Sequence, residues 1–345
     1  MARMRKFTVM GALWLLTWPA GATAQSVAQE TIRWRTGDVA LEGTLYLPGT
    51  PGPHPAAVFI HGSGSLTRSD RMYREHAERC ARMGLAMLVY DKRGTGASTG
   101  DWRAATLSDL ADDALGGVRE LRTHKSIARE QVGVFGASQG GWIALLAASR
   151  DPAIAFIVTL SGPTITPAEQ GHFILEARMR LKKHPDDAIA RALVLDRQIA
   201  DVYRTGKGRA EIERALKAAG AEPWFADAGL GVQTEDSWNW KWYRDLPMDF
   251  DPMPHLKALR APLFAAHGAL DAVVPAARSA ETVRMLGAAG RKDMTTVVYP
   301  DVGHVLHTQP GGPSRTWAAP SGYWSDIEIW FRSRKILPPT RGEER

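Results

Sequence analysis

The stretch that most constrains this chain is Gly136-Ala-Ser-Gln-Gly140, which places Ser138 between glycine-bearing flanks. The short apolar run Val132–Phe135 before it is typical of a buried strand, and Ile143–Ala148 after it is rich in helix-forming residues. A serine at such a junction lies on a sharp, strained turn, where only glycine neighbours avoid a steric clash. Its hydroxyl is then exposed at the edge of a sheet, near the N–H groups at the helix start. The same pattern also occurs in ordinary turns, so a nucleophilic Ser138 requires a base, an acid and a second N–H donor elsewhere.

A glycine-bearing loop, His61-Gly-Ser-Gly64, directly follows the apolar run Ala56–Ile60, which is typical of a strand buried on both faces. Glycine lets backbone N–H groups approach a ligand closely. Taken alone, the loop could be any strand-to-helix turn. Beside a reactive serine, it predicts the second half of an oxyanion hole, in which the N–H of Ser63, or less favourably Gly64, acts together with that of Gln139.

Two later strand ends carry a carboxylate and an imidazole. Asp271 lies in the loop after the apolar run 261–266, and His304 follows Gly303 in the loop after the run 295–299. Ligands of open α/β sheets bind at the carboxyl ends of the strands, so both side chains are expected near Ser138. A triad needs one residue to attack, one to accept its proton and one carboxylate to fix the imidazole tautomer. We therefore predict Ser138 as nucleophile, His304 as base and Asp271 as the orienting carboxylate.

Other residues compete for these roles. Asp271 could be a simple turn residue and His304 a surface histidine. His307 is an alternative base, but no glycine precedes it. His61 is interpreted as shaping the oxyanion loop and His267 as a structural neighbour of Asp271. Three further carboxylates that do not follow a core strand are weaker candidates for the acid: Asp245, Asp249 and Asp251.

Apolar runs and helical stretches alternate along most of the chain. An antiparallel hairpin is predicted around Thr36-Gly-Asp38, and strand, helix and strand then repeat as far as Leu160. This rhythm predicts an α/β fold with a mostly parallel central sheet and helices on both faces. We expect the body of this fold in two parts, residues 25–163 and 252–334, with a loose tail at 335–345.

Residues 164–251 break the rhythm with three charged amphipathic helical stretches. We interpret this segment as a helical cap inserted over the carboxyl ends of the strands. Four aromatic residues cluster near its end, and they could pack the cap on the body or line an acyl pocket: Trp238, Trp240, Trp242 and Tyr243.

No motif in the chain indicates a metal or cofactor. There is no H-E-x-x-H, no S-x-x-K and no paired cysteine site, since Cys80 is the only cysteine and is expected in the core. The loop Asp91-Lys-Arg-Gly-Thr-Gly-Ala-Ser98 has glycine spacing but lacks the pattern of a phosphate-binding loop. We expect Asp91 and Arg93 to form an ion pair that fixes it.

The first 24 residues resemble an export signal, with a basic start, the apolar run Phe7–Trp18 and the small-residue site Ala22-Thr-Ala24. Export and cleavage near Ala24 would make the protein periplasmic or secreted. An uncleaved membrane anchor is the alternative, although the run is short for a bilayer span. Without residues 1–24 the net charge falls from +6 to +3, which does not suggest a nucleic-acid partner. With 44% hydrophobic and 23% charged residues, the chain can bury a sizeable core.

The combined motifs resemble those of serine hydrolases of the α/β-hydrolase superfamily, and more narrowly the exported bacterial esterases and dienelactone-hydrolase-like proteins. The resemblance covers about 31–334, including the Ser, Asp, His order of the three predicted residues. It rests on Leu41-Glu-Gly-Thr-Leu45, His61-Gly-Ser-Gly64, Tyr90–Ser98, Gly136–Gly140, Phe250-Asp-Pro252, Gly268–Asp271 and Gly303-His304.

The function that the resemblance and the predicted triad imply is hydrolysis of a small-molecule carboxylic ester through an acyl-enzyme. Serine rather than cysteine at position 138 argues against dienelactone hydrolysis itself. A serine peptidase, an acyltransferase or a thioesterase on the same fold are the alternatives. A non-catalytic binding protein is a remote alternative, because all three predicted triad residues are present.

Overall fold

The computed structural model describes residues 26–235, 237, 240, 243–244, 248–307 and 318–339. Its strands are β1 (Val27–Thr36), β2 (Val39–Pro48), β3 (His54–Ile60), β4 (Ala86–Tyr90), β5 (Ile127–Ala137), β6 (Ile157–Leu160), β7 (Leu263–Gly268) and β8 (Met294–Tyr299). Its helices are α1 (Arg71–Met83), α2 (Leu107–Thr123), α3 (Gln139–Arg150), α4 (Pro167–Leu181), α5 (Asp186–Thr205), α6 (Arg209–Ala219), α7 (Phe225–Ala228), α9 (Pro252–Ala258), α10 (Ala276–Ala288), α11 (Tyr323–Ser333) and the 3₁₀ turn η1 (His304–Leu306).

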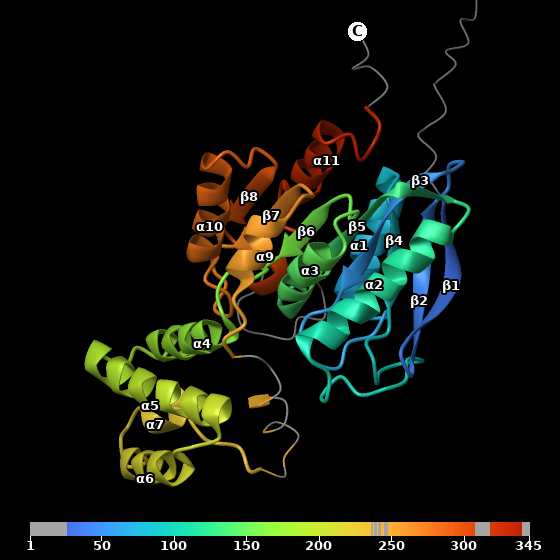
Figure 1. The fold of residues 1–345 in the computed structure, drawn as a ribbon. Helices are drawn as coiled ribbons and strands as arrows, with labels where there is room; N and C mark the ends of the chain where they lie inside the picture. Colours follow the sequence, from blue (N-terminus) through green and yellow to red (C-terminus); the bar gives the residue numbers. More distant parts are fainter. Residues whose placement is uncertain are drawn as a thin grey trace, which may run out of the picture.

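The strands form one sheet in the order β1-β2-β4-β3-β5-β6-β7-β8 (Figure 1). The hairpin β1–β2 is antiparallel and joins β4 in antiparallel register. All pairs from β4 to β8 are parallel. The predicted α/β-hydrolase fold is therefore confirmed, and β5, which leads to Ser138, lies in the middle of the sheet.

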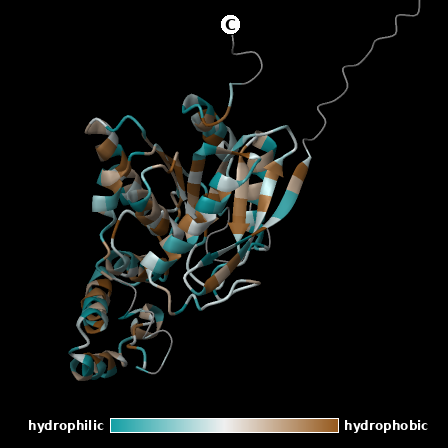
Figure 2. Cartoon of the chain, turned by 45° about the vertical axis from the view of Figure 1, so that its right-hand side comes forward, coloured by the Kyte–Doolittle hydropathy of each residue, from teal (hydrophilic) through white to brown (hydrophobic). Residues whose placement is uncertain are grey.

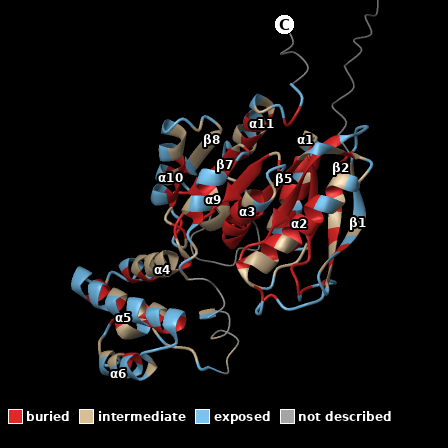
Figure 3. Cartoon of the chain, in the orientation of Figure 1, coloured by how far each residue is buried: buried red, intermediate tan, exposed pale blue. Residues whose placement is uncertain are grey.

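Alternate side chains of the central strands enter two different cores. In β3, Ala56 and Val58 pack under α2, α3, α9 and α10, whereas Ala57 and Phe59 pack under α1 and α11. This arrangement explains why the strand sequences are continuously apolar, since a strand covered on both faces has no polar side. The central strands β3, β4, β6 and β7 and the inner helix faces are buried, whereas β1 is mostly exposed (Figure 3). Hydrophobic residues run along the central strands (Figure 2).

Helices α4 to α7 lie between β6 and β7 in sequence and extend to one side of the sheet (Figure 1). They form small apolar clusters of their own, one of them around Leu175, Met179 and Trp224. Of the aromatic cluster predicted here, Trp240 packs 5.2 Å from the ring of Tyr203, and Tyr243 stacks on the same ring at 4.8 Å. Trp238 and Trp242 lie outside the described residues.

The loop after β4 corrects one prediction. Arg93 does not pair with Asp91; its guanidinium forms two hydrogen bonds to Asp113 of α2, at 2.7 and 2.8 Å. Asp91 instead accepts hydrogen bonds from the backbone N–H groups of Arg68 and Ala97. The two side chains turn in opposite directions because Asp91 faces its own glycine-rich loop, while Arg93 faces the neighbouring helix.

Several predictions on the ends of the chain lie outside the described residues, including the export signal at 1–24 and most of the tail at 335–345. Cys80 is fully buried in α1, and burial raises the pKa of its thiol, as expected for a core residue. Among the helices that the structure describes, none combines the length and apolar character that a bilayer crossing demands.

Candidate active site

Ser138 lies at the junction of β5 and α3 with φ 53° and ψ −121°, a conformation that strains any residue with a Cβ. Its N–H donates to the carbonyl of Leu160 at 2.9 Å, which ties the turn to β6. A Cβ added to Gly136 would lie 2.2 Å from the carbonyl oxygen of Gly140, and one on Gly140 would lie 2.4 Å from that of Ile60. The two glycines are therefore required because backbone segments touch at both positions.

The structure brings Ser138, His304 and Asp271 together in one chain of hydrogen bonds. His304 Nε2 lies 2.9 Å from Ser138 Oγ, and His304 Nδ1 lies 2.9 Å from Asp271 Oδ2 and 3.1 Å from Oδ1. A carboxylate accepts, so Nδ1 carries the proton and Nε2 is left to accept from the serine hydroxyl. The three residues come from loops after β5, β7 and β8, in agreement with their predicted strand ends.

Asp271 is held as a carboxylate in a buried position. Its Oδ1 also accepts from the N–H groups of Val273 and Val274, at 2.8 and 2.9 Å. Burial raises the pKa of Asp271, but the hydrogen bond and charge of His304 and the two N–H groups outweigh it, so the pKa lies below its ordinary value. Asp271 can therefore hold the imidazole at neutral pH.

The loop that carries His304 is fastened from two sides. Val305 and Leu306 have positive φ, 49° and 60°, and the N–H of Val305 donates to Ser161 Oγ at 3.0 Å. Gly268, at the end of β7, lies directly against this loop: an added Cβ would lie 2.2 Å from the carbonyl oxygen of Gly303. The imidazole is thus positioned by backbone contacts with the neighbouring strand ends.

The loop 61–64 lies beside Ser138, as the sequence predicts. A Cβ on Gly62 would be 3.4 Å from Ser138 Cβ. The N–H of Gly62 donates to Tyr73 Oη at 2.9 Å, while the carbonyl of Gly62 accepts from Lys92 Nζ at 2.8 Å. Lys92 Nζ also donates to Gln139 Oε1 at 3.2 Å. Hydrogen bonds to both the N–H and the carbonyl of Gly62 therefore fix the loop just before Ser63.

The competing candidates have other contacts. Asp251 caps α9 by accepting from the N–H of Met253, and Asp249 pairs with Arg204. His307 closes the His304 turn through its backbone, since its carbonyl accepts from the N–H of Gly303. Asp245 lies outside the described residues.

His61 and His267 are both buried in the body of the fold. His61 packs against the rings of Tyr73 and Tyr90, and burial and then the charge of Lys92 lower its pKa to about 3. Burial also lowers the pKa of His267, to about 4, although Asp271 opposes this shift. Both imidazoles are therefore neutral at pH 7, which suits a structural role.

Sequence reasoning missed three residues around the site: Lys92, Tyr73 and Ser161. Lys92 had a signal, because a lysine only two residues after a fully apolar strand is hard to place in solvent. Tyr73 and Ser161 had none, since a tyrosine in a helix and a serine after a strand are common in any α/β protein.

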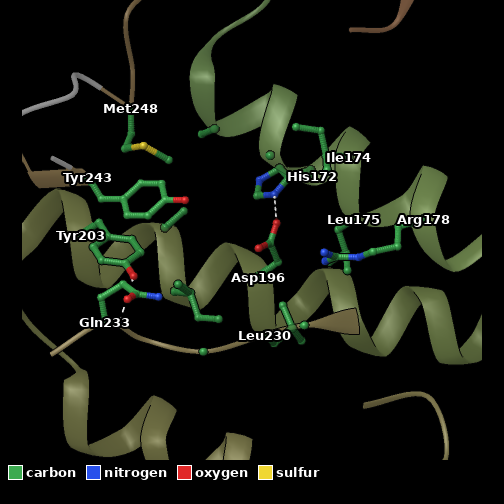
Figure 4. A pocket seen from close by; sticks show the side chains of 16 residues that line it. His172, Ile174, Leu175, Arg178, Asp196, Tyr203, Leu230, Gln233, Tyr243 and Met248 are labelled. Carbon is green, nitrogen blue, oxygen red and sulfur yellow. Dashed lines mark hydrogen bonds and ion pairs between the residues drawn. The ribbon is translucent and has the colours of Figure 1, made fainter. Parts of the chain in front are cut away.

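A separate cavity of about 280 Å³ lies within the inserted helices, between α4, α5 and the segment 229–233 (Figure 4). His172 Nδ1 and Asp196 Oδ2 meet at 2.6 Å on its wall. Tyr243 lines it, whereas Trp240 packs under the guanidinium of Arg209. Trp240 therefore packs against residues of α5 and α6 within the inserted segment, rather than between the cap and the body, and Tyr243 faces a cavity.

The part of the chain that the structure describes contains no group of three or more His, Cys, Asp or Glu side chains arranged to hold a metal ion. The hydrogen-bonded residues of the site are a hydroxyl, an imidazole and a carboxylate, the groups of a serine nucleophile and its base.

Comparison with known proteins gives the family. Residues 36–305 match the X-Pro dipeptidyl-peptidase (S15) family. A monoacylglycerol lipase of Mycolicibacterium smegmatis is 27% identical over 283 residues, which cover 77% of this chain and 87% of the lipase. An esterase of Thermotoga maritima is 27% identical over 135 residues, which cover 38% of this chain and 32% of that esterase.

Among solved structures, an esterase of Pyrococcus furiosus has a TM-score of 0.57 with 17% identity, and the match covers 89% of this chain and 91% of the esterase. At this identity the likeness shows a shared fold. Together with the family match, which spans most of the chain, it confirms the predicted resemblance to serine hydrolases of the α/β-hydrolase superfamily. The chain belongs to the X-Pro dipeptidyl-peptidase (S15) family and is a serine hydrolase of the α/β-hydrolase fold.

Proposed function

We propose that this hydrolase cleaves carboxylic esters, with Ser138 as nucleophile, His304 as general base and acid, and Asp271 as the carboxylate that orients His304. The observation that carries the proposal is the chain of hydrogen bonds from Ser138 Oγ through both nitrogens of His304 to Asp271. A serine hydroxyl is a weak nucleophile until a base in contact with it can take its proton.

In the first half of the reaction, Ser138 Oγ attacks the ester carbonyl carbon while His304 Nε2 takes the hydroxyl proton. The carbonyl π electrons move to oxygen and give a tetrahedral oxyanion. When this collapses, the bond between the carbonyl carbon and the alcohol oxygen breaks, and His304 returns the proton to the departing alcohol. Asp271 stabilises the imidazolium that exists between these two transfers.

In the second half, a water molecule attacks the carbonyl carbon of the acyl-enzyme by the same steps. His304 takes a proton from the water, the new oxyanion collapses, and the bond to Ser138 Oγ breaks as the serine regains its proton.

We assign the oxyanion hole to the backbone N–H groups of Ser63 and Gln139. Gln139 is the first residue of α3, where N–H groups have no carbonyl partner inside the helix.

The choice of esters is supported by relatives rather than by the geometry, because the same three residues serve acyl transfer from amides and thioesters as well. One relative is named a monoacylglycerol lipase, and the match covers 87% of that protein. A second relative is named an esterase. Both names describe cleavage of an ester.

The test is hydrolysis of p-nitrophenyl esters from acetate to octanoate by the purified wild type and by Ser138→Ala. We expect the variant to lose at least about 10³-fold in kcat/KM. Ser149→Ala is the matched control, because Ser149 lies at the other end of α3 and bonds Leu146 and His255. Equal rates for the wild type and Ser138→Ala would refute the proposal, and a fluorophosphonate probe that fails to label the protein would favour a binding protein.

One observation favours a second function, cleavage of peptides after an amino-terminal Xaa-Pro pair, because the matched family is described by that activity. The same assay should therefore include Ala-Pro-p-nitroanilide. If kcat/KM for this anilide exceeds that of every ester in the panel, and Ser138→Ala abolishes it, the peptidase function replaces the esterase function.

We further propose that the protein acts outside the cytoplasm, on the basis of the basic and apolar start of the chain. Amino-terminal sequencing of the protein recovered from a periplasmic fraction should begin near Gln25. Recovery of a chain that begins at Met1 from the membrane fraction would favour the uncleaved anchor.

A further inference from the structure

Lys92 lies where a charged side chain is costly. It lies two residues after the end of β4 and is only 2% exposed. Among the described residues, no carboxylate lies within ion-pair distance of Lys92. The two nearby carboxylates pair with arginines instead, Asp91 with Arg68 and Asp113 with Arg93. Its Nζ is held instead by two neutral acceptors and lies 5.6 Å from the centroid of the Trp102 ring. A buried ammonium retained without a counter-ion calls for a function.

Both acceptors belong to the segments that carry the proposed oxyanion donors. The carbonyl of Gly62 and the N–H of Ser63 form one trans peptide group, so they point in opposite directions. A hydrogen bond from Lys92 to that carbonyl fixes the peptide plane and polarises the N–H on its far side. The second acceptor is the side chain of Gln139, whose own backbone N–H is the other donor.

We propose that Lys92 is a positioning residue of the oxyanion hole, which ties the Gly62–Ser63 peptide to Gln139 and places a positive charge behind both N–H donors. This inference rests on the proposed function. A fixed charge in a buried site acts most strongly on the charged oxyanion and weakly on the neutral ester. Lys92 should therefore contribute to kcat much more than to KM.

The charge of Lys92 depends on pH. Burial lowers the pKa of its ammonium group to about 7, and the nearby charge of Asp113 only partly opposes this. The ammonium form, and with it the proposed contribution, is therefore present below pH 7 and lost as the pH rises through 7. Several titratable or charged groups surround Lys92 on the elements packed against it: His61 after β3, Tyr73 on α1, Asp91 and Arg93 beside it, and Asp113 on α2.

The experiment compares the wild type with Lys92→Met and Lys92→Arg between pH 5 and pH 10. Ester hydrolysis gives kcat and KM, and the rate of labelling of Ser138 by a fluorophosphonate gives a readout that needs no ester turnover. Titration with the same reagent counts active sites, so misfolded protein does not enter kcat. Thr95→Val is the matched control, because Thr95 fastens the same loop by bonding the carbonyls of Leu66 and Lys92.

We expect Lys92→Met to lose about 10- to 100-fold in kcat per active site at pH 6, with KM within about twofold. The wild type should show a fall in kcat and in labelling rate with a midpoint near pH 7. This fall should be absent in Lys92→Met and retained in Thr95→Val. In Lys92→Arg its midpoint should move to higher pH. A purely structural Lys92 would lower the number of active sites but leave kcat per site and the pH profile unchanged, and this result overturns the proposal.

The two proposals fail in different ways. A wild type that is labelled but cleaves no ester refutes the ester substrate, while the labelling rates still test Lys92. A wild type that cleaves esters at a rate independent of pH from 7 to 9 refutes the role of Lys92 alone, even where Lys92→Met does not fold. A wild type that neither cleaves nor is labelled refutes both, since no oxyanion then forms at Ser138.

Discussion

Ser161 Oγ accepts a hydrogen bond of 3.0 Å from the backbone N–H of Val305, the residue after His304. Ser161 follows β6 and Val305 follows β8, so the bond crosses over β7 and links the two strand ends. Both residues have φ near +50°, a conformation that is costly for β-branched valine. The bond therefore helps to hold the strained turn that carries His304.

Ser161→Ala tests this link. Without the acceptor, the turn around Val305 can relax toward negative φ, and His304 Nε2 should spend less time within reach of Ser138. We expect kcat to fall about tenfold with little change in KM, measured on p-nitrophenyl butyrate. Ser279→Ala is the control, since Ser279 is equally buried and its Oγ has no hydrogen-bond partner among the described residues. An unchanged kcat in Ser161→Ala would contradict the prediction.

Gly268→Ala should move the same loop from the other side. The added methyl would lie 2.2 Å from the carbonyl oxygen of Gly303 and 2.4 Å from that of Val302, so the backbone must shift. We expect a loss of about 100-fold in kcat and a destabilisation of about 2 kcal/mol, measured by ester assay and urea unfolding. Gly287→Ala, where the nearest atom would be 3.7 Å away, should retain the wild-type kcat and lose no stability. Wild-type activity in Gly268→Ala would show that the loop has room to move.

The strain at Ser138 should be measurable as stability. Glycine tolerates the φ of 53° found here, whereas alanine retains the Cβ that makes it costly. Both Ser138→Gly and Ser138→Ala remove the hydroxyl, so their difference isolates the backbone. We expect Ser138→Gly to be more stable than Ser138→Ala by about 1 kcal/mol in urea unfolding. The opposite order would mean that the turn is not strained in solution.

Three buried histidines should make the fold sensitive to acid. Burial lowers the pKa of His61 to about 3 and that of His76 and His267 to about 4, although the hydrogen bond of His76 to Met72 and the charge of Asp271 near His267 oppose the shift. Between these values and about 6.5, the unfolded chain binds protons that the folded chain does not. The free energy of unfolding should therefore fall as the pH drops below 6.5, by about 1.4 kcal/mol per pH unit for each histidine.

Urea unfolding of the wild type and of His76→Gln between pH 7 and pH 5 would measure this dependence. His76 lies on α1 and bonds Tyr323, away from the proposed catalytic residues. The free energy of unfolding should depend less steeply on pH in the variant than in the wild type. The difference in slope should correspond to about one proton fewer taken up on unfolding. Equal slopes would show that His76 is protonated in the folded protein.

Local patterns determined much of this protein. The apolar runs and the glycine turns predict the strands, the helices and their order, because a strand buried on both faces and an amphipathic helix each leave a period in the sequence. The chain order of Ser138, Asp271 and His304 behind three such strands was enough to predict that they meet, since parallel strands bring their carboxyl ends to one edge.

Only the tertiary structure decided which partner each loop residue has. Arg93 is two residues from Asp91 and twenty from Asp113, yet it pairs with Asp113. The sheet order places β4 beside β3 and β3 beside β5, so Lys92 reaches both Gly62 and Gln139. Such contacts join residues far apart in the chain, and their geometry depends on strand order and loop packing that no local pattern encodes.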